Sequence, residues 1–168
     1  MIGQCCVVLG YFTDALEYFG SAVLIQKRVS KQVSVDQELA LYHIEQGICL
    51  FKMKKYNEAK TLLAESLTIL QNLGEELMAK EIAETSNKMG GCCVELGLVT
   101  DALTYSGLAV STQKRFSKQE CTDQNLALYY HNHGICLLNM ETYNEAKIHL
   151  VESLMIRTNL GEKLMGKK

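Results

Sequence analysis

The chain repeats itself after 87 residues without a gap. The run Gly3–Val7 matches Gly90–Val94, and the run Tyr56–Lys60 matches Tyr143–Lys147. In all, 48 of the 81 overlapping positions are identical. Self-similarity at a fixed period predicts an array of stacked units in place of a single irregular core. It also disfavours an enzyme, because a catalytic site needs a set of residues that occurs once.

The spacing of apolar residues within each unit is that of helices. One stripe at helical spacing consists of Leu41, Ile44, Ile48 and Phe51. The 168 residues include no proline, which helix interiors exclude and which strand-rich proteins use in their turns. The link 53–57 is short enough to require that the helices on either side of it form an antiparallel hairpin.

The same periodicity predicts eight helices and the beginning of a ninth. Their expected ranges are 1–9, 12–29, 36–53, 56–72, 75–96, 99–116, 123–139 and 143–159, with a stub at 162–168. Asp36 and Asp123 are predicted to be N-caps, and Gly74 and Gly161 are predicted to end helices. The largely polar segments 30–35 and 117–122 are expected to be loops or frayed helix ends.

Small residues recur at fixed places in all four predicted hairpins. An alanine stands at each of Ala15, Ala59, Ala102 and Ala146. Twelve residues before each alanine stands a glycine, at Gly3, Gly47, Gly90 and Gly134. This pattern resembles the tetratricopeptide repeat, or TPR, in which small residues let the two helices of a hairpin approach closely.

The resemblance covers essentially the whole chain and implies a fold class. We expect an all-α, right-handed superhelix of four hairpins with truncated terminal helices, forming one domain over residues 1–168. The repeats would span about 1–29, 36–72, 75–116 and 123–159, with the stub 162–168. The spacing of 44, 43 and 44 residues exceeds the usual 34. It is similar to the long-repeat subclass of kinesin light chains and Pins-type scaffolds.

The resemblance further implies a function in protein–protein interaction. In this family the first helix of each hairpin lines a concave groove that holds a peptide or helix of a partner. Carried over to this chain, the groove consists of Ile44, Ile48, Phe51, Lys52, Asn87, Lys88, Gly91, Glu95, His131, Asn132, Ile135, Leu138 and Asn139. The lysine and asparagine clamp of chaperone-binding members is not matched, so an extended or amphipathic peptide with apolar anchors is the expected partner.

Self-association is the alternative function. No polar capping helix closes either end of the predicted array, and an uncapped array exposes an apolar end face. The chain would then be a fragment of a longer array that dimerises or stacks head to tail through its ends.

The cysteines are the most reactive side chains in the sequence. Cys5, Cys49, Cys92 and Cys136 share one place in their respective hairpins, and we interpret them as small buried apolar residues. Cys121 falls in a predicted loop and is expected to be exposed. His133 and Cys136 are three residues apart and could share a helix face, but the first unit repeats no such pair, so we expect no metal site.

Other classes of function find no support in the sequence. The chain contains no phosphate-binding loop, no G-x-S-x-G and no H-E-x-x-H, so we expect neither an enzyme nor a cofactor. A net charge of -2 argues against nucleic acid. The recurring basic helix ends 26–28 and 113–115 suit the helix dipole, with an edge for an acidic partner as the alternative. No apolar run or secretory signal suggests a membrane, so a cytoplasmic protein is expected.

Overall fold

The computed structural model of the chain describes residues 2–29, 33–117 and 123–165. All the regular secondary structure in these residues is α-helical, as the sequence predicts. The helices are α1 (Ile2–Leu9), α2 (Phe12–Val29), α3 (Val33–Lys52), α4 (Tyr56–Leu73), α5 (Ala79–Glu95), α6 (Val99–Phe116), α7 (Gln124–Asn139) and α8 (Tyr143–Met165).

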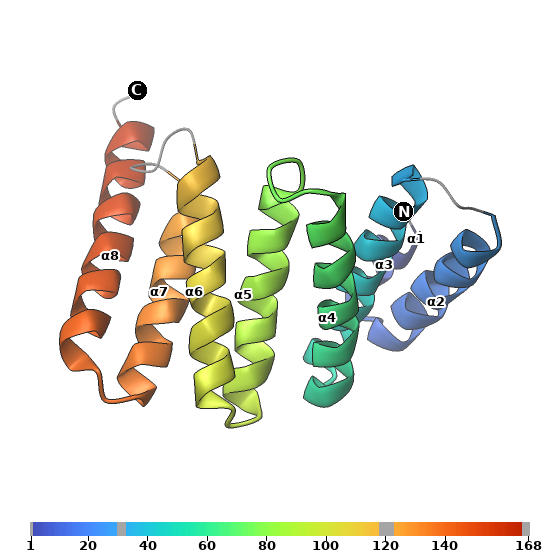
Figure 1. The fold of residues 1–168 in the computed structure, drawn as a ribbon, viewed down its shortest axis with the longest axis horizontal. Coiled ribbons are helices and arrows are strands. Elements are labelled where there is room, and N and C mark those ends of the chain that lie inside the picture. The colour runs from blue at the N-terminus through green and yellow to red at the C-terminus, as the bar shows by residue number, and fades with distance from the viewer. Residues whose placement is uncertain (1, 30–32, 118–122, 166–168) are drawn as a thin grey trace.

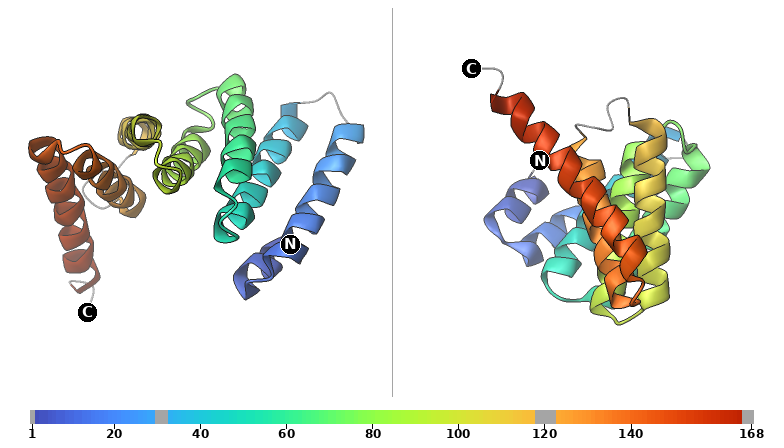
Figure 2. Two further views of the ribbon diagram at one scale, coloured as in Figure 1. Left: turned by 90° about the horizontal axis from the view of Figure 1, so that it is seen from below. Right: turned by 90° about the vertical axis from the view of Figure 1, so that its left-hand side faces the viewer.

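The helices pair into four hairpins that stand side by side (Figure 1). The pairs are α1 with α2, α3 with α4, α5 with α6, and α7 with α8. The second helix of each hairpin packs on the first helix of the next, and α5 also contacts both α3 and α7. The result is an α-helical repeat superhelix whose first and last hairpins lie at opposite ends (Figure 2).

In each hairpin, a glycine of the first helix packs against the residue of the second helix that lies sixteen positions further along the chain. A Cβ atom added at Gly47 would lie 2.8 Å from Leu63, and one at Gly134 would lie 2.8 Å from Leu150. The same relation joins Gly3 to Phe19 at 2.9 Å and Gly90 to the backbone nitrogen of Ser106 at 3.3 Å. A Cβ atom at any of these glycines would force its neighbour to move, so the expected close approach of the two helices is confirmed.

A buried serine in the second helix fastens the two helices of a hairpin at the other end. The hydroxyl of Ser66 donates to the carbonyl oxygen of Ala40 over 2.9 Å. The hydroxyl of Ser153, one unit later, donates to the carbonyl oxygen of Ala127 over 2.6 Å. Because both bonds span the same separation in sequence, the 87-residue repeat extends to individual hydrogen bonds.

Two of the predicted helix ends are confirmed. The carboxylate of Asp123 accepts hydrogen bonds from the backbone N–H groups of Asn125 and Leu126, which makes it the N-cap of α7. Gly74 follows α4 with a φ of 113°, a conformation that other residues rarely adopt. The chain then turns, and α5 begins at Ala79, four residues after the expected start at 75.

Two other predicted helix ends are wrong. Helix α3 begins at Val33, so Asp36 lies within its first turn and is not the N-cap. A carboxylate is favourable in either place, because both lie close to the positive end of the helix dipole. Helix α8 runs through Gly161 to Met165, so this glycine does not end the helix and residues 162–165 do not begin another.

Cysteines in the interior of the array are buried, whereas Cys5 on the first helix is exposed. Cys49, Cys92 and Cys136 are buried, which confirms their interpretation as small apolar residues. Burial raises the pKa of the Cys49 and Cys92 thiols to about 11, so both stay protonated. Cys5 is exposed on α1, where no described helix covers the outer face. Cys121 lies outside the described residues.

None of the described helices is both long enough and apolar enough to cross a membrane.

Candidate peptide-binding groove

Two adjoining hollows lie on the face formed by α3, α5 and α7, the first helices of three successive hairpins. The first has a volume of about 230 Å³ and is lined by Gly47, Ile48, Phe51, Lys52, Leu63, Asn87, Lys88, Gly91 and Asn132. The second has a volume of about 200 Å³ and is lined by Phe51, Asn87, Gly90, Gly91, Val94, Glu95, Ser106, Asn132, Ile135 and Cys136. We call the two hollows together the groove.

Most of the residues that the sequence predicts for a groove meet at these hollows. Nine of the thirteen line one hollow or both: Ile48, Phe51, Lys52, Asn87, Lys88, Gly91, Glu95, Asn132 and Ile135. His131, Leu138 and Asn139 lie on α7 but line neither hollow.

Ile44 departs from the sequence expectation. It is only 6% exposed and belongs to the core cluster shared by α3, α4 and α5. The helical stripe that it shares with Ile48 turns inward at this point, so Ile44 contributes to packing within the array and offers little accessible surface to a partner.

The two hollows meet at four shared residues. The side-chain amide of Asn132 donates to the side-chain oxygen of Asn87 over 2.8 Å and joins α7 to α5. The ring of Phe51 stands edge-on to that of Tyr56, with ring centroids 5.3 Å apart, which fixes its orientation. A Cβ atom at Gly91 would lie 3.6 Å from the Phe51 ring, so this glycine opens the groove without being required by packing.

Six residues that line the groove are not among the thirteen predicted residues: Gly47, Leu63, Gly90, Val94, Ser106 and Cys136. The signal for four of them was present in the recurring glycines. Where the first helix carries glycine, its partner in the second helix comes within reach of the groove, as Leu63 does at Gly47 and Ser106 at Gly90.

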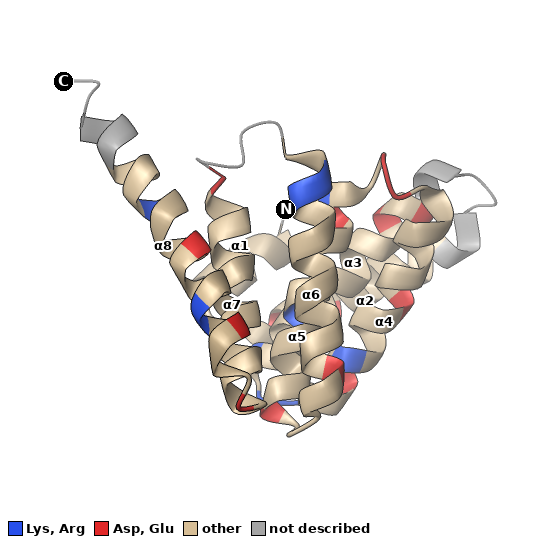
Figure 3. Cartoon of the chain, turned by 60° about the vertical axis from the view of Figure 1, so that its left-hand side comes forward, with Lys and Arg blue, Asp and Glu red and all other residues tan. Residues whose placement is uncertain are grey.

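Charges of both signs border the groove. Lys88 forms an ion pair with Glu84 at 3.3 Å, while Lys52 and Glu95 are exposed. Elsewhere Arg115 pairs with Glu75 at 3.2 Å. In the view of Figure 3, basic and acidic residues are interspersed over the helices. The groove is therefore an apolar and amide-rich surface with mixed charge at its edge.

A histidine pair lies behind the groove, between α6, α7 and α8. The hydroxyl of Ser106 lies 2.8 Å from Nδ1 of His133, whose ring stands edge-on to that of His149 with centroids 4.7 Å apart. Burial, together with the neighbouring His149, lowers the pKa of His133 to about 4. Both rings are neutral near pH 7, and they contribute to packing as aromatic side chains.

No cluster of three or more His, Cys, Asp or Glu residues suited to a metal ion occurs in the part of the chain that the structure describes.

Comparison with known proteins gives no sequence relative: no family model and no curated protein matches the chain. Solved structures do match. BtubC (BKLC) from P. vanneervenii aligns over 95% of this chain and 62% of its own length, with a TM-score of 0.84 and 15% identity. The apo form of RapI aligns over 92% of this chain and 40% of its own, with a TM-score of 0.77 and 17% identity.

A third match decides the type of repeat. A "Podosopora anserina putative kinesin light chain" with nearly identical TPR-like repeats aligns over 95% of this chain and 73% of its own, with a TM-score of 0.73 and 15% identity. The chain has a TPR-type fold. The TPR-type chain spans less than two thirds of the length of BtubC and RapI, and at these identities the likeness concerns the fold alone.

Proposed function

We propose that this TPR-type chain is an interaction scaffold that holds a peptide or helix of a protein partner in the groove of α3, α5 and α7. The observation that carries the proposal is the composition of the two hollows. Apolar anchors, Ile48, Phe51 and Ile135, surround the amides of Asn87 and Asn132. This combination of apolar pockets with a few fixed polar groups is typical of peptide recognition.

The size of the hollows favours a peptide over a small molecule. At about 230 and 200 Å³ each hollow is smaller than a typical small-molecule site of roughly 300–1,000 Å³. Each suits one apolar side chain. A segment that places two such side chains in neighbouring hollows, with its backbone along Asn87 and Asn132, would use the whole groove.

A selection experiment tests the proposal. The full chain is used to select binders from a displayed peptide library, and their affinity is then measured for the wild type and for Ile135→Asp. Ile135 is 37% exposed, so the substitution should leave the fold intact while it places a charge in the second hollow. We expect selected peptides to carry two apolar residues and to bind the variant at least tenfold more weakly.

A matched control separates the groove from the rest of the surface. Thr104→Asp introduces the same charge on the exposed side of α6, outside the groove. It should bind the selected peptides as the wild type does. Binding that Thr104→Asp and Ile135→Asp reduce equally would contradict the assignment of the groove.

A further inference from the structure

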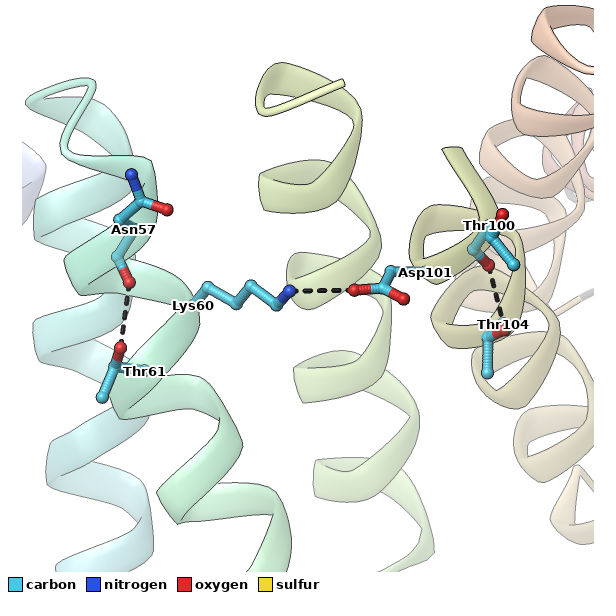
Figure 4. A network of polar contacts seen from close by, with 6 residues as sticks. All are labelled: Asn57, Lys60, Thr61, Thr100, Asp101 and Thr104. Atoms are coloured by element: carbon cyan, nitrogen blue, oxygen red, sulfur yellow. Dashed lines mark hydrogen bonds and ion pairs between the residues drawn. The ribbon is translucent and has the colours of Figure 1, made fainter. Parts of the chain in front are cut away.

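The junction between the second and third hairpins, where α4 packs on α5 and α6, shows how two successive hairpins join. The ammonium of Lys60 on α4 lies 2.9 Å from a carboxylate oxygen of Asp101 on α6, across the boundary between the second and third hairpins (Figure 4). At the same junction, Met89 and Cys92 of α5 are 1% and 0% exposed. They belong to one core cluster with Leu63 and Leu67 of α4.

The sequence carries both halves of this ion pair a second time, at the two ends of the array. The 87-residue repeat places Lys147 on α8 where Lys60 stands on α4, and Asp14 on α2 where Asp101 stands on α6. Lys147 and Asp14 are both exposed. They cannot meet within one chain, because α2 and α8 lie at opposite ends (Figure 1).

Apolar side chains on the terminal helices α1 and α8 are exposed where their internal copies are buried. Ile2 of α1 is 62% exposed, whereas Met89 at the same place is 1% exposed. On α8, Leu154 is 64% exposed, whereas Leu67 is 7% exposed. Cys5 is likewise exposed and lines an open hollow with Gln4, Val8 and Leu9.

Only part of the apolar surface that α4 presents at the internal junction is repeated on α8. Leu70 of α4 is fully buried against the beginning of α5, but Arg157 stands at the matching place on α8. Lys147, Leu150 and Leu154 remain, and these match the residues of α4 that face the end of α5 and the start of α6. The two end faces are thus complementary in charge and in apolar surface over the same portion of the junction.

We propose that the chain stacks head to tail on a second copy, with α8 of one copy against α1 and α2 of the next and Lys147 paired with Asp14 of that second copy. The internal junction of α4 with α5 and α6 is the template. Since the two faces differ, the contact is heterologous and extends to longer assemblies. The second copy's α1 would lie beside α7 as α5 lies beside α3, which leaves the groove open and lengthens it.

Light scattering across a concentration series of the full chain, from about 10 µM to 1 mM, tests this proposal. We expect the mean mass to rise steadily above that of the 18.8 kDa monomer. Lys147→Glu and Asp14→Lys should each weaken association about tenfold or more, because each places like charges opposite one another. Both positions are exposed, so circular dichroism should be that of the wild type.

A mixture of the two variants tests directly whether Lys147 pairs with Asp14 of a second copy. The Lys147→Glu variant keeps its Asp14, and the Asp14→Lys variant keeps its Lys147. In an equimolar mixture the two introduced charges can therefore face one another, and so can the two unchanged side chains, so association should return to near the wild-type level. Lys54→Glu makes the same change of charge in the exposed turn between α3 and α4 and should associate as the wild type.

Two results would overturn the stacking proposal: a monomer at every concentration, or association that neither charge reversal weakens. Peptide binding to the groove is measured separately at about 1 µM, where the chain should be monomeric. Failure of the stacking proposal therefore leaves the groove proposal standing, and failure of peptide binding leaves the stacking result intact.

Discussion

Asn132 of α7 donates a hydrogen bond of 2.8 Å to Asn87 of α5, at the place where the two hollows of the groove meet. The bond joins the first helices of successive hairpins directly, whereas most other contacts between hairpins run through a second helix. It also fixes the orientation of two amides whose remaining donors and acceptors border the groove. The pair thus links two successive hairpins and also forms part of the proposed binding surface.

The coupling between these two amides can be measured by a double-mutant cycle. We expect Asn132→Ala and Asn87→Ala each to lower the free energy of unfolding by about 1 kcal/mol, because each leaves a half-buried amide without its partner. The double variant should lose less than the sum, with a coupling of roughly 0.5–1.5 kcal/mol. Urea titrations of the four proteins give these values, and additive losses would contradict the bond.

The recurring glycines should respond to alanine according to the space around them. Gly47→Ala and Gly134→Ala each place a Cβ atom 2.8 Å from a leucine of the second helix, so each should lower the free energy of unfolding by about 1–3 kcal/mol. Thermal and urea unfolding check the loss. The two values should agree closely, because the repeat places Leu63 and Leu150 alike.

Gly91→Ala is the matched control for the glycine series. Its Cβ atom would lie 3.6 Å from Phe51, an ordinary contact, and alanine favours a helix over glycine by up to about 1 kcal/mol. This variant should be as stable as the wild type or more so. A loss as large as that of Gly47→Ala would show that glycine serves another purpose than close packing of the two helices.

The buried serines should make equal contributions in the two units. Ser66→Ala and Ser153→Ala each remove a buried hydrogen bond between the helices of a hairpin, and each should lower the free energy of unfolding by about 1 kcal/mol. Ser111→Ala removes an exposed hydroxyl that bonds only within its own helix, and it should change stability by less than about 0.5 kcal/mol. Unequal losses at Ser66 and Ser153 would contradict the structural repeat.

The histidine pair predicts a dependence of stability on pH. The pKa of His133 lies at about 4 in the folded chain, below its ordinary value near 6.5, because burial disfavours the imidazolium. The unfolded state therefore takes up a proton first as the pH falls. Stability should decrease from about pH 6.5 down to about 4 and then level off for this group, with a loss of about 1–2 kcal/mol after allowance for its partial exposure.

His133→Gln tests the origin of this dependence, because glutamine stands at the matching place in the first unit, at Gln46. Urea unfolding at several pH values should show a flatter curve of stability against pH between pH 6.5 and 4 for the variant.

Asp123 contributes to the pH dependence of stability at lower pH. Burial works to raise the pKa of Asp123, but hydrogen bonds from Ser117, Gln113 and the backbone outweigh it and lower the value. Its contribution is lost only as the pH falls through that lowered pKa.

The sequence predicted the hairpins well because their packing depends on single small residues. Gly47 and Ala59 can be read directly from the sequence, and in the structure a Cβ atom at Gly47 would force the Leu63 side chain to shift. Helix ends were harder to predict, since the signals have more than one meaning. Asp36 suits the first turn as well as the N-cap, and glycine at 161 is tolerated inside α8.

The groove was predicted in part, for a reason that Ile44 and Ile48 illustrate. Both lie on one stripe of α3, one turn apart, yet only Ile48 lines a hollow, because neighbouring hairpins cover Ile44. Which residues of a stripe stay accessible depends on how far successive hairpins rotate, and no pattern of residue types records that rotation. The hydrogen bond between Asn87 and Asn132 depends on the same rotation.

The most direct test of peptide binding in the groove is to fill the groove without adding charge. A selected peptide is titrated against the wild type, Gly91→Leu and the exposed control Thr104→Leu, with binding followed by calorimetry. Gly91 lines both hollows, so a leucine there should block them and weaken binding at least tenfold, while Thr104→Leu should bind as the wild type. Unchanged affinity for a folded Gly91→Leu variant would show that the peptide does not bind in the groove.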